Sequence, residues 1–229
     1  MIRVTENLTF ISNLLATAAN EAQRDPETVR LLAVSKKQSV EKILEAAAAG
    51  QRDFGENFVQ EGVDKIQKTA EYRLVWHFIG HLQTNKTRPV AEHFDWVHSV
   101  DRWKTADRLS RQRPATLGDL NICLQVNVDE EVSKSGMTVD TLRDLAGRIA
   151  DLPRIRLRGL MCLPAIRHDF DEQRQPFARL RRLADQLRAD GIPTDTLSMG
   201  MSDDYRAAIF EGSTIVRIGT AVFGPRNAT

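Results

Sequence analysis

Leu31-Leu32-Ala33-Val34-Ser35-Lys36 is the stretch that decides the fold of this chain. Its four apolar residues, bounded by Arg30 and Ser35, predict a short strand that is buried on both faces. Such a strand belongs to a parallel sheet covered by helices, where the carboxyl ends of the strands are the usual place for chemistry. Lys36 leaves the strand at that end and offers a reactive amine, although a surface lysine at a strand end is the plain alternative.

Helical patterns lie on both sides of this strand. Apolar residues at helical spacing from Leu8 to Ala22 predict a helix that ends before Asp25-Pro26, because the residue ahead of a proline is pushed out of helical geometry. After Lys36, Ser39 is expected to cap a second helix, which Gly50 ends. Residues 1–28 should therefore form a helix that packs on the domain behind it.

The strand-helix unit then recurs along the chain. The further strands are predicted at 53–55, 75–79, 95–100, 122–128, 157–161, 196–198 and 215–218. The helices between them are predicted at 58–69, from 84, and at 101–112, 139–150, 177–187 and 202–212. Strands that alternate with helices in this way favour one (β/α)8 barrel domain over residues 1–229 rather than a doubly wound sheet.

Composition and charge exclude several kinds of partner. The chain has 32 Lys plus Arg and 31 Asp plus Glu, a formal net charge of +1, so no overall field attracts nucleic acid or a membrane surface. Cys123 and Cys162 match no metal-binding spacing and read as buried thiols in a reducing compartment. We expect a cytoplasmic protein without a metal, and a monomer, since no large exposed apolar stripe is evident.

Polar and small residues follow several of the predicted strands. A barrel would bring Lys36, Asn57, the Gly80 loop, Ser202 and Gly219-Thr220 to one face. Gly219-Thr220 and a helix start at Ser202 resemble a phosphate site, although ordinary capping explains them equally well. An amine beside a phosphate site can form an imine with a sugar phosphate, as in an aldolase, or with the aldehyde of pyridoxal phosphate.

Seven strings of sequence choose between these chemistries. They are Leu32-Ala33-Val34-Ser35-Lys36, Phe54-Gly55-Glu56-Asn57, residues 76–86 (WHFIGHLQTNK), Lys134-Ser135-Gly136, Arg158-Gly159-Leu160-Met161, residues 197–204 (LSMGMSDD) and residues 216–224 (VRIGTAVFG). Together they resemble the pyridoxal phosphate homeostasis proteins of the YggS/PROSC family. The resemblance runs from about Leu31 to Gly224.

This resemblance implies a TIM barrel of the alanine racemase type, the fold type III of pyridoxal phosphate (PLP) proteins. It implies that PLP is held as a Schiff base, an internal aldimine, on Lys36. By motif position, the remaining cofactor-binding residues would be Ser202, Gly219 and Thr220 at the phosphate, Asn57 near the ring hydroxyl and Arg217 at the pyridine nitrogen.

Arg217 bears on the chemistry of such a site. A guanidinium stays protonated and can only donate hydrogen bonds, so it disfavours a protonated pyridine ring and weakens the ring as an electron sink. A simple salt bridge at a strand end is the alternative role for this arginine.

Several observations favour a carrier over an enzyme. A racemase needs a second acid or base opposite the lysine. In the alanine racemases that role belongs to a tyrosine of an added C-terminal β domain, whereas here only Pro225 to Thr229 follow Gly224, and neither Tyr72 nor Tyr205 is an obvious substitute. We expect no catalytic residue and a protein of vitamin B6 homeostasis that stores PLP and passes it to apo-enzymes; a PLP-dependent amino-acid racemase is the alternative.

Two further lysines carry a subsidiary hypothesis. Lys86 and Lys134 lie on predicted loops and could relay the cofactor, although loop lysines are usually only solvated.

Overall fold

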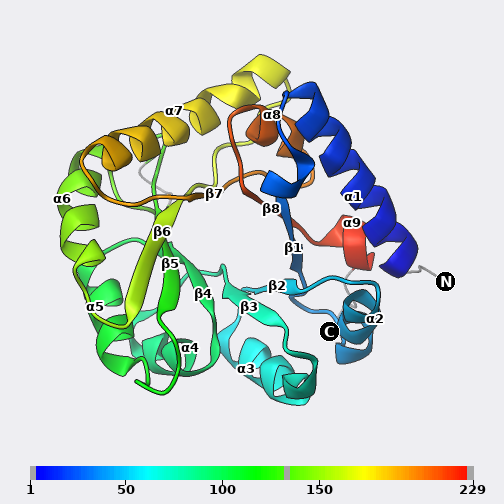
Figure 1. Cartoon of the computed structure of the whole chain (residues 1–229), viewed down its shortest axis with the longest axis horizontal. Coiled ribbons are helices and arrows are strands. Elements are labelled where there is room, and N and C mark those ends of the chain that lie inside the picture. Colours follow the sequence, from blue (N-terminus) through cyan, green and yellow to red (C-terminus); the bar gives the residue numbers. More distant parts are fainter. Residues whose placement is uncertain (1–3, 132–134, 226–229) are drawn as a thin grey trace.

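The strands close into a barrel, in a computed structural model that describes residues 4–131 and 135–225. Eight parallel strands pair in chain order, and β1 closes the ring by pairing with β8 (Figure 1). The strands are β1 Arg30–Val34, β2 Asp53–Glu56, β3 Val75–Phe78, β4 Trp96–Val100, β5 Leu120–Gln125, β6 Ile155–Met161, β7 Thr196–Ser198 and β8 Ile215–Ile218. The predicted (β/α)8 barrel is thereby confirmed.

Helices surround this barrel (Figure 1). They are α1 Val4–Glu21, α2 Val40–Ala48, α3 Val59–Lys68, α4 Thr87–His93, α5 Trp103–Gln112, α6 Val139–Ala150, α7 Phe170–Ala189, α8 Tyr205–Phe210 and α9 Thr220–Phe223. Short 3-10 turns lie at η1 Pro26–Thr28, η2 Ala70–Tyr72 and η3 Thr84–Lys86. None of the helices in the described ranges is both long and apolar enough to cross a membrane.

The N-terminal helix α1 lies on the outside of the barrel, beside α2, α8 and α9 (Figure 1). Its apolar stripe, which includes Leu8, Ile11 and Leu15, is buried there. Polar bonds add to this packing: the Asn7 amide donates to the carbonyl of Val222 over 2.9 Å, and Glu21 pairs with Arg206. The helix therefore covers the seam at which β8 meets β1.

The alternating pattern of β5 is confirmed. Ile122 and Leu124 face outward into the main hydrophobic core between strands and helices. Cys123 points inward and packs with Trp96 and Met161 in a separate small cluster within the barrel. Both cysteines are buried and no disulfide joins them, and burial raises the pKa of the Cys123 thiol to about 12.

Several predicted element ends are wrong, including the three that follow. The helix expected to be capped by Ser202 starts three residues later, with Asp204 at its N-cap, because the chain first makes a turn at 202–204. The strand predicted at 122–128 ends at Gln125, after which Val126 makes only an isolated bridge. The helix predicted from 177 begins at Phe170, since Asp169 caps it by accepting a hydrogen bond from the backbone of Glu172.

Candidate functional site

A cavity of about 630 Å³ opens at the carboxyl ends of the strands. All six residues that the sequence predicts for a cofactor lie on its wall: Lys36, Asn57, Ser202, Arg217, Gly219 and Thr220. They follow or end four different strands, β1, β2, β7 and β8, and barrel closure alone brings them together. The volume is in the range of sites that enclose a small organic molecule.

Lys36 is held at the rim of this cavity by its two neighbours. The Ser35 hydroxyl donates to Glu56 Oε1 over 2.6 Å, and the backbone N–H of Lys37 donates to Glu61 Oε1 over 2.6 Å. Both residues beside Lys36 are thus attached to groups on β2 and α3. The half-buried Lys36 side chain lines the cavity, and its backbone is held on both sides.

The buried amine of Lys65 organises this anchor. Its Nζ atom donates to the Ser35 carbonyl at 2.7 Å, to Glu56 Oε1 at 2.8 Å and to Glu61 Oε1 at 2.6 Å. Burial raises the pKa of the Glu56 carboxyl, against the opposing effect of the Lys65 charge. Sequence reasoning missed this cluster, because a Glu61–Lys65 pair four residues apart is indistinguishable from an ordinary pair on a helix surface.

Arg217 forms part of the cavity floor and is almost fully buried. Its Nη1 donates to Ser198 Oγ over 2.7 Å and its Nη2 donates to the Cys162 carbonyl over 2.9 Å. No carboxylate in the described residues forms an ion pair with Arg217, so the salt-bridge alternative finds no partner there. Burial lowers the pKa of this guanidinium, while Asp204 is among the groups that oppose the shift.

The residues after β7 and β8 leave donors available to an anion. The backbone N–H groups of Ser202 and Gly219 have no acceptor in the described part of the chain, and neither has the hydroxyl of Thr220. Asp204 Oδ1 already accepts the neighbouring N–H of Met201 over 2.6 Å. Burial raises the pKa of the Asp204 carboxyl, a shift that the positive charge of Arg217 opposes.

Asn57 lines the same cavity and has an acceptor without a partner among the described residues. Its Oδ1 is buried and has no hydrogen-bond partner in the structure as described. Gly80 packs directly on its backbone, where an added Cβ would lie 2.1 Å from the carbonyl oxygen of Asn57. Only glycine allows the β3 loop this close approach, which holds Asn57 in place.

Sequence reasoning did not select several other residues that line the cavity. They are Val34, Ile79, His81, Gln125, Ser135, Leu163, Pro164 and Met201. The inward half of the β5 alternation could have identified Gln125, and Val34 ends β1, whereas most of the others lie on loops without a periodic signal. Neither Tyr72 nor Tyr205 is among the described lining residues.

Of the two lysines proposed to pass the cofactor on, only Lys86 lies among the described residues. Lys86 lies in η3 and lines a smaller hollow, of about 500 Å³, that shares Asn57 and His81 with the main cavity. Lys134 lies outside the described residues. The site as described therefore combines one amine, one donor-only cation, free N–H groups and a buried acceptor, a set that suits an anionic molecule carrying a carbonyl group.

Comparison with known proteins places the chain among relatives of similar length. The family described as alanine racemase, N-terminal domain, matches residues 11–227. A pyridoxal phosphate homeostasis protein of Pseudomonas aeruginosa is 54% identical over 227 residues, 99% of this chain and 97% of that protein. One of Escherichia coli K12 is 49% identical over 227 residues, 98% of this chain and 97% of that protein.

Solved structures give the same picture of the fold. PipY of Synechococcus elongatus PCC7942, with PLP bound, matches with a TM-score of 0.82 and 38% identity, over 96% of this chain and 100% of that one. Alanine racemase of Corynebacterium glutamicum matches with a TM-score of 0.71 and 14% identity, over 99% of this chain and 62% of the racemase, a likeness of fold alone.

Proposed function

The chain belongs to the pyridoxal phosphate homeostasis proteins, and on that premise we propose that it binds pyridoxal 5′-phosphate in the 630 Å³ cavity and carries it within the cell. In this proposal the protein stores the cofactor and hands it to apo-enzymes that depend on it. The observation that carries the proposal is the convergence of the Lys36 amine and the Arg217 guanidinium on one cavity with free anion donors.

Lys36 is the residue proposed to hold the cofactor covalently. Its amine would add to the cofactor aldehyde, and loss of one water would leave a Schiff base between nitrogen and carbon. The anchoring of Ser35 and Lys37 supports this role, because it fixes the backbone on both sides of the reacting side chain.

The other residues are proposed to bind the remaining groups of the cofactor. The free N–H groups of Ser202 and Gly219 and the hydroxyl of Thr220 suit the phosphate. The unused Oδ1 of Asn57 can accept from the ring hydroxyl, and Arg217 can donate to the ring nitrogen. When bound, the cofactor supplies an electron sink, which a donor-only partner at the ring nitrogen keeps weak.

This property of Arg217 favours carriage over turnover. A racemase would also need a second proton donor or acceptor facing the bound molecule. Neither Tyr72 nor Tyr205 lies on the described cavity wall, so neither is placed to act as that second proton donor or acceptor.

The test begins with the absorbance of the purified protein. The holoprotein should absorb in the near violet, and Lys36→Ala should remove that band. Lys104→Ala, which changes an exposed lysine on α5, serves as the matched control and should keep it. Borohydride reduction, digestion and mass analysis should place the adduct on the peptide that contains Lys36, and an adduct on another lysine would reject the assignment.

Activity measurements separate the carrier from its alternatives. Incubation of the holoprotein with single-enantiomer amino acids should leave their optical activity unchanged, and sustained loss would establish a racemase instead. A colourless preparation that borohydride traps only with a sugar phosphate would point to an aldolase. Transfer is tested by mixing the holoprotein with an apo-enzyme and following the recovery of its activity.

A further inference from the structure

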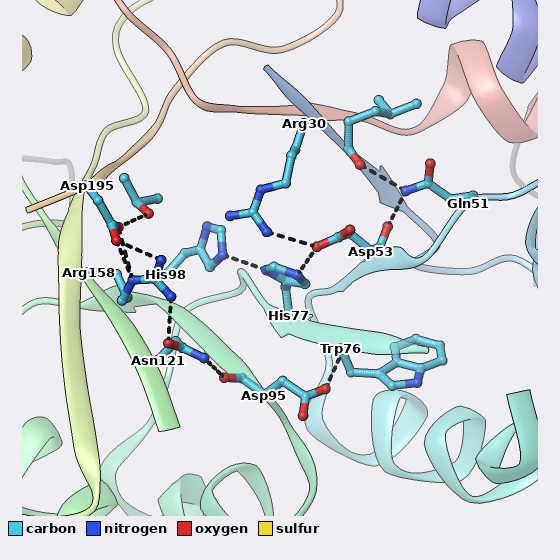
Figure 2. Close-up of polar contacts among 12 residues, drawn as sticks. Arg30, Gln51, Asp53, Trp76, His77, Asp95, His98, Asn121, Arg158 and Asp195 are labelled. Atoms are coloured by element: carbon cyan, nitrogen blue, oxygen red, sulfur yellow. Dashed lines mark hydrogen bonds and ion pairs between the residues drawn. The ribbon is translucent and has the colours of Figure 1, made fainter. Parts of the chain in front are cut away.

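A chain of hydrogen bonds crosses the barrel interior from Arg217 toward the amino ends of the strands. After the bond from Arg217 to Ser198, Ser198 Oγ lies 2.8 Å from His98 Nδ1, and His98 Nε2 lies 2.9 Å from His77 Nδ1. His77 Nε2 lies 2.9 Å from Asp53 Oδ1, which is 3.6 Å from Arg30 (Figure 2). Each of these residues comes from a different strand.

The middle of this chain is dry and rigid. Ser198, His98 and His77 have no solvent-exposed surface, whereas the Asp53 side chain is 20% exposed at the amino end. The His77 ring stacks on Trp96, with centroids 5.4 Å apart and planes 12° from parallel. The imidazole rings therefore have a fixed orientation, and their hydrogen bonds cannot be exchanged for bonds to water.

The two ends of the chain determine the direction of every bond. The Arg217 guanidinium can only donate, so Ser198 Oγ accepts from it. The hydroxyl proton then goes to His98 Nδ1, the other polar atom within hydrogen-bond distance of Ser198 Oγ among the described residues. At the other end, the Asp53 carboxylate only accepts, so His77 donates from Nε2 and accepts at Nδ1. His98 then bridges the two halves by donating from Nε2.

This direction assigns both histidines. Each must be neutral and carry its proton on Nε2, because an added proton on Nδ1 would face another donor. Burial lowers the pKa of His77 and lowers that of His98 strongly, in agreement with two neutral rings. The other charged groups that act on these rings are Arg30, Asp95 and Arg217.

We propose that Ser198, His98, His77 and Asp53 form a one-way hydrogen-bonded relay that orients Arg217 toward the cavity and couples its guanidinium to a carboxylate at the opposite end of the barrel. The four residues are positioning residues, since none of them lines the cavity among the described residues. Hydrogen bonds in series polarise one another in a dry interior, so the negative charge of Asp53 partly offsets the positive charge of Arg217.

The consequence for the bound cofactor rests on the proposed function. Protonation of the cofactor adds positive charge near Arg217, and the relay makes that addition easier by offsetting the guanidinium. Cutting the relay should therefore lower the pH at which the bound cofactor takes up its proton.

The first experiment examines the relay without cofactor. The protein is labelled with nitrogen-15 histidine and arginine, and His77→Asn and His98→Asn assign the signals of the two rings. Both rings should be neutral with the proton on Nε2 at neutral pH, and rotation of the Arg217 guanidinium should be slow. Ser198→Ala, which removes the acceptor of Nη1, should make that rotation at least about threefold faster.

The second experiment titrates the absorbance of the PLP-loaded protein with pH. His98→Asn keeps an acceptor near Ser198, but its side chain is too short to donate to His77 as well. Asp53→Asn keeps an acceptor for His77 but lacks the charge. Both should lower the titration midpoint by about half a pH unit or more. His93→Asn is the control, because His93 lies on α4 and, within the described part of the chain, its ring hydrogen-bonds only to the carbonyl of Pro89.

The outcomes separate the relay from the proposed function. An Nδ1–H or charged ring in either histidine, or unchanged guanidinium rotation in Ser198→Ala, would overturn the relay whether or not PLP binds. An unchanged midpoint in both relay variants would overturn its coupling to the cavity. Failure of the wild-type protein to take up PLP would reject the proposed function, while the first experiment would still decide the relay.

Discussion

The two ends of the barrel use polar residues in opposite ways. At the amino end, charged groups satisfy one another: Arg158 pairs with Asp195 at 2.7 Å (Figure 2). The Arg158 guanidinium also lies 4.9 Å from the centre of the Trp96 ring, and Arg30 lies over the same ring at 5.5 Å. At the carboxyl end, the Asn57 acceptor and the N–H groups of Ser202 and Gly219 are left unused around a cavity.

This contrast teaches how one barrel separates stability from binding. Groups that satisfy each other stabilise the fold but have nothing left for a ligand, whereas groups held without partners are available to one. We therefore expect substitutions at the amino end to change stability and substitutions at the carboxyl end to change cofactor binding. The exception is the cluster of Lys65, Glu56 and Glu61, whose charged groups satisfy one another although they lie beside the cavity.

The largest effect should come from that exception. Lys65→Met leaves the buried Glu56 carboxylate without its cation and should lower the free energy of unfolding by about 3–5 kcal/mol, measured by chemical denaturation. Lys65→Met combined with Glu56→Gln should recover much of this loss, because the uncompensated charge is gone. Equal losses in the single and double variants would show that packing, not charge, makes this cluster stabilising.

The next effect should fall on binding alone. Gly80→Ala places a Cβ 2.1 Å from the Asn57 carbonyl, so Asn57 must move and the affinity for PLP should fall about tenfold or more, measured by titration of the apoprotein. Gly118→Ala is the matched control, since an added Cβ there has no atom within 4 Å. Unchanged affinity in Gly80→Ala would contradict the placement of Asn57 in the binding site.

The pH dependence of the free energy of unfolding should report on His77 and His98, which lie between the two ends of the barrel. Because burial lowers the pKa of His77 and His98, both are neutral in the folded protein, while in the unfolded chain they gain protons below about pH 6.5. Their contribution is complete above that pH and is lost as the pH falls, with a slope of up to about 1.4 kcal/mol per pH unit for each histidine.

Denaturation at about pH 7.5, 6.5 and 5.5 measures this slope. His98→Asn should show a shallower loss than the wild-type protein, because one of the two buried imidazoles is absent. Parallel curves for both proteins would mean that His98 is already charged in the folded state.

The smallest effect should come from the surface of the amino end. Asp195→Asn weakens a partly exposed ion pair and should lower the free energy of unfolding by less than about 1 kcal/mol. The affinity for PLP should stay within about twofold of the wild type, because Asp195 belongs to the opposite end from the cavity. A large loss of binding in this variant would break the separation between the two ends.

Much of the fold could be predicted from local patterns. Apolar runs and their turn residues predicted β7 and β8 at their observed bounds, and the helical spacing of residues 139–150 predicted α6. Element ends depended on side-chain contacts that spacing does not encode. Asp169 lengthened α7 by capping it at Phe170, and the turn before Asp204 shortened α8.

The residues of the candidate site also fall into two groups, those that local patterns could identify and those that depend on tertiary packing. Lys36 and Gly219 could be identified because each lies just after the end of a predicted strand, where the barrel rule places chemistry, whereas Arg217 was identified by the family resemblance alone. Gln125 could have been found by the same rule, from the inward half of β5. Lys65 could not, since its burial depends on how α3 packs against β2 and the loop after β1.

The sequence by itself determined the order of strands and helices, and hence the face on which Lys36 and Arg217 meet, because periodicity and turn residues act over a few neighbours. Only the tertiary structure decided which polar groups became partners. His98 and Ser198 are 100 residues apart in the chain, and their bond exists because closure of the barrel brings β4 and β7 to face each other across a dry interior. No local sequence pattern predicts such a pairing, because the bond is stabilised by the exclusion of water from the barrel interior and not by the neighbours of each residue in the chain.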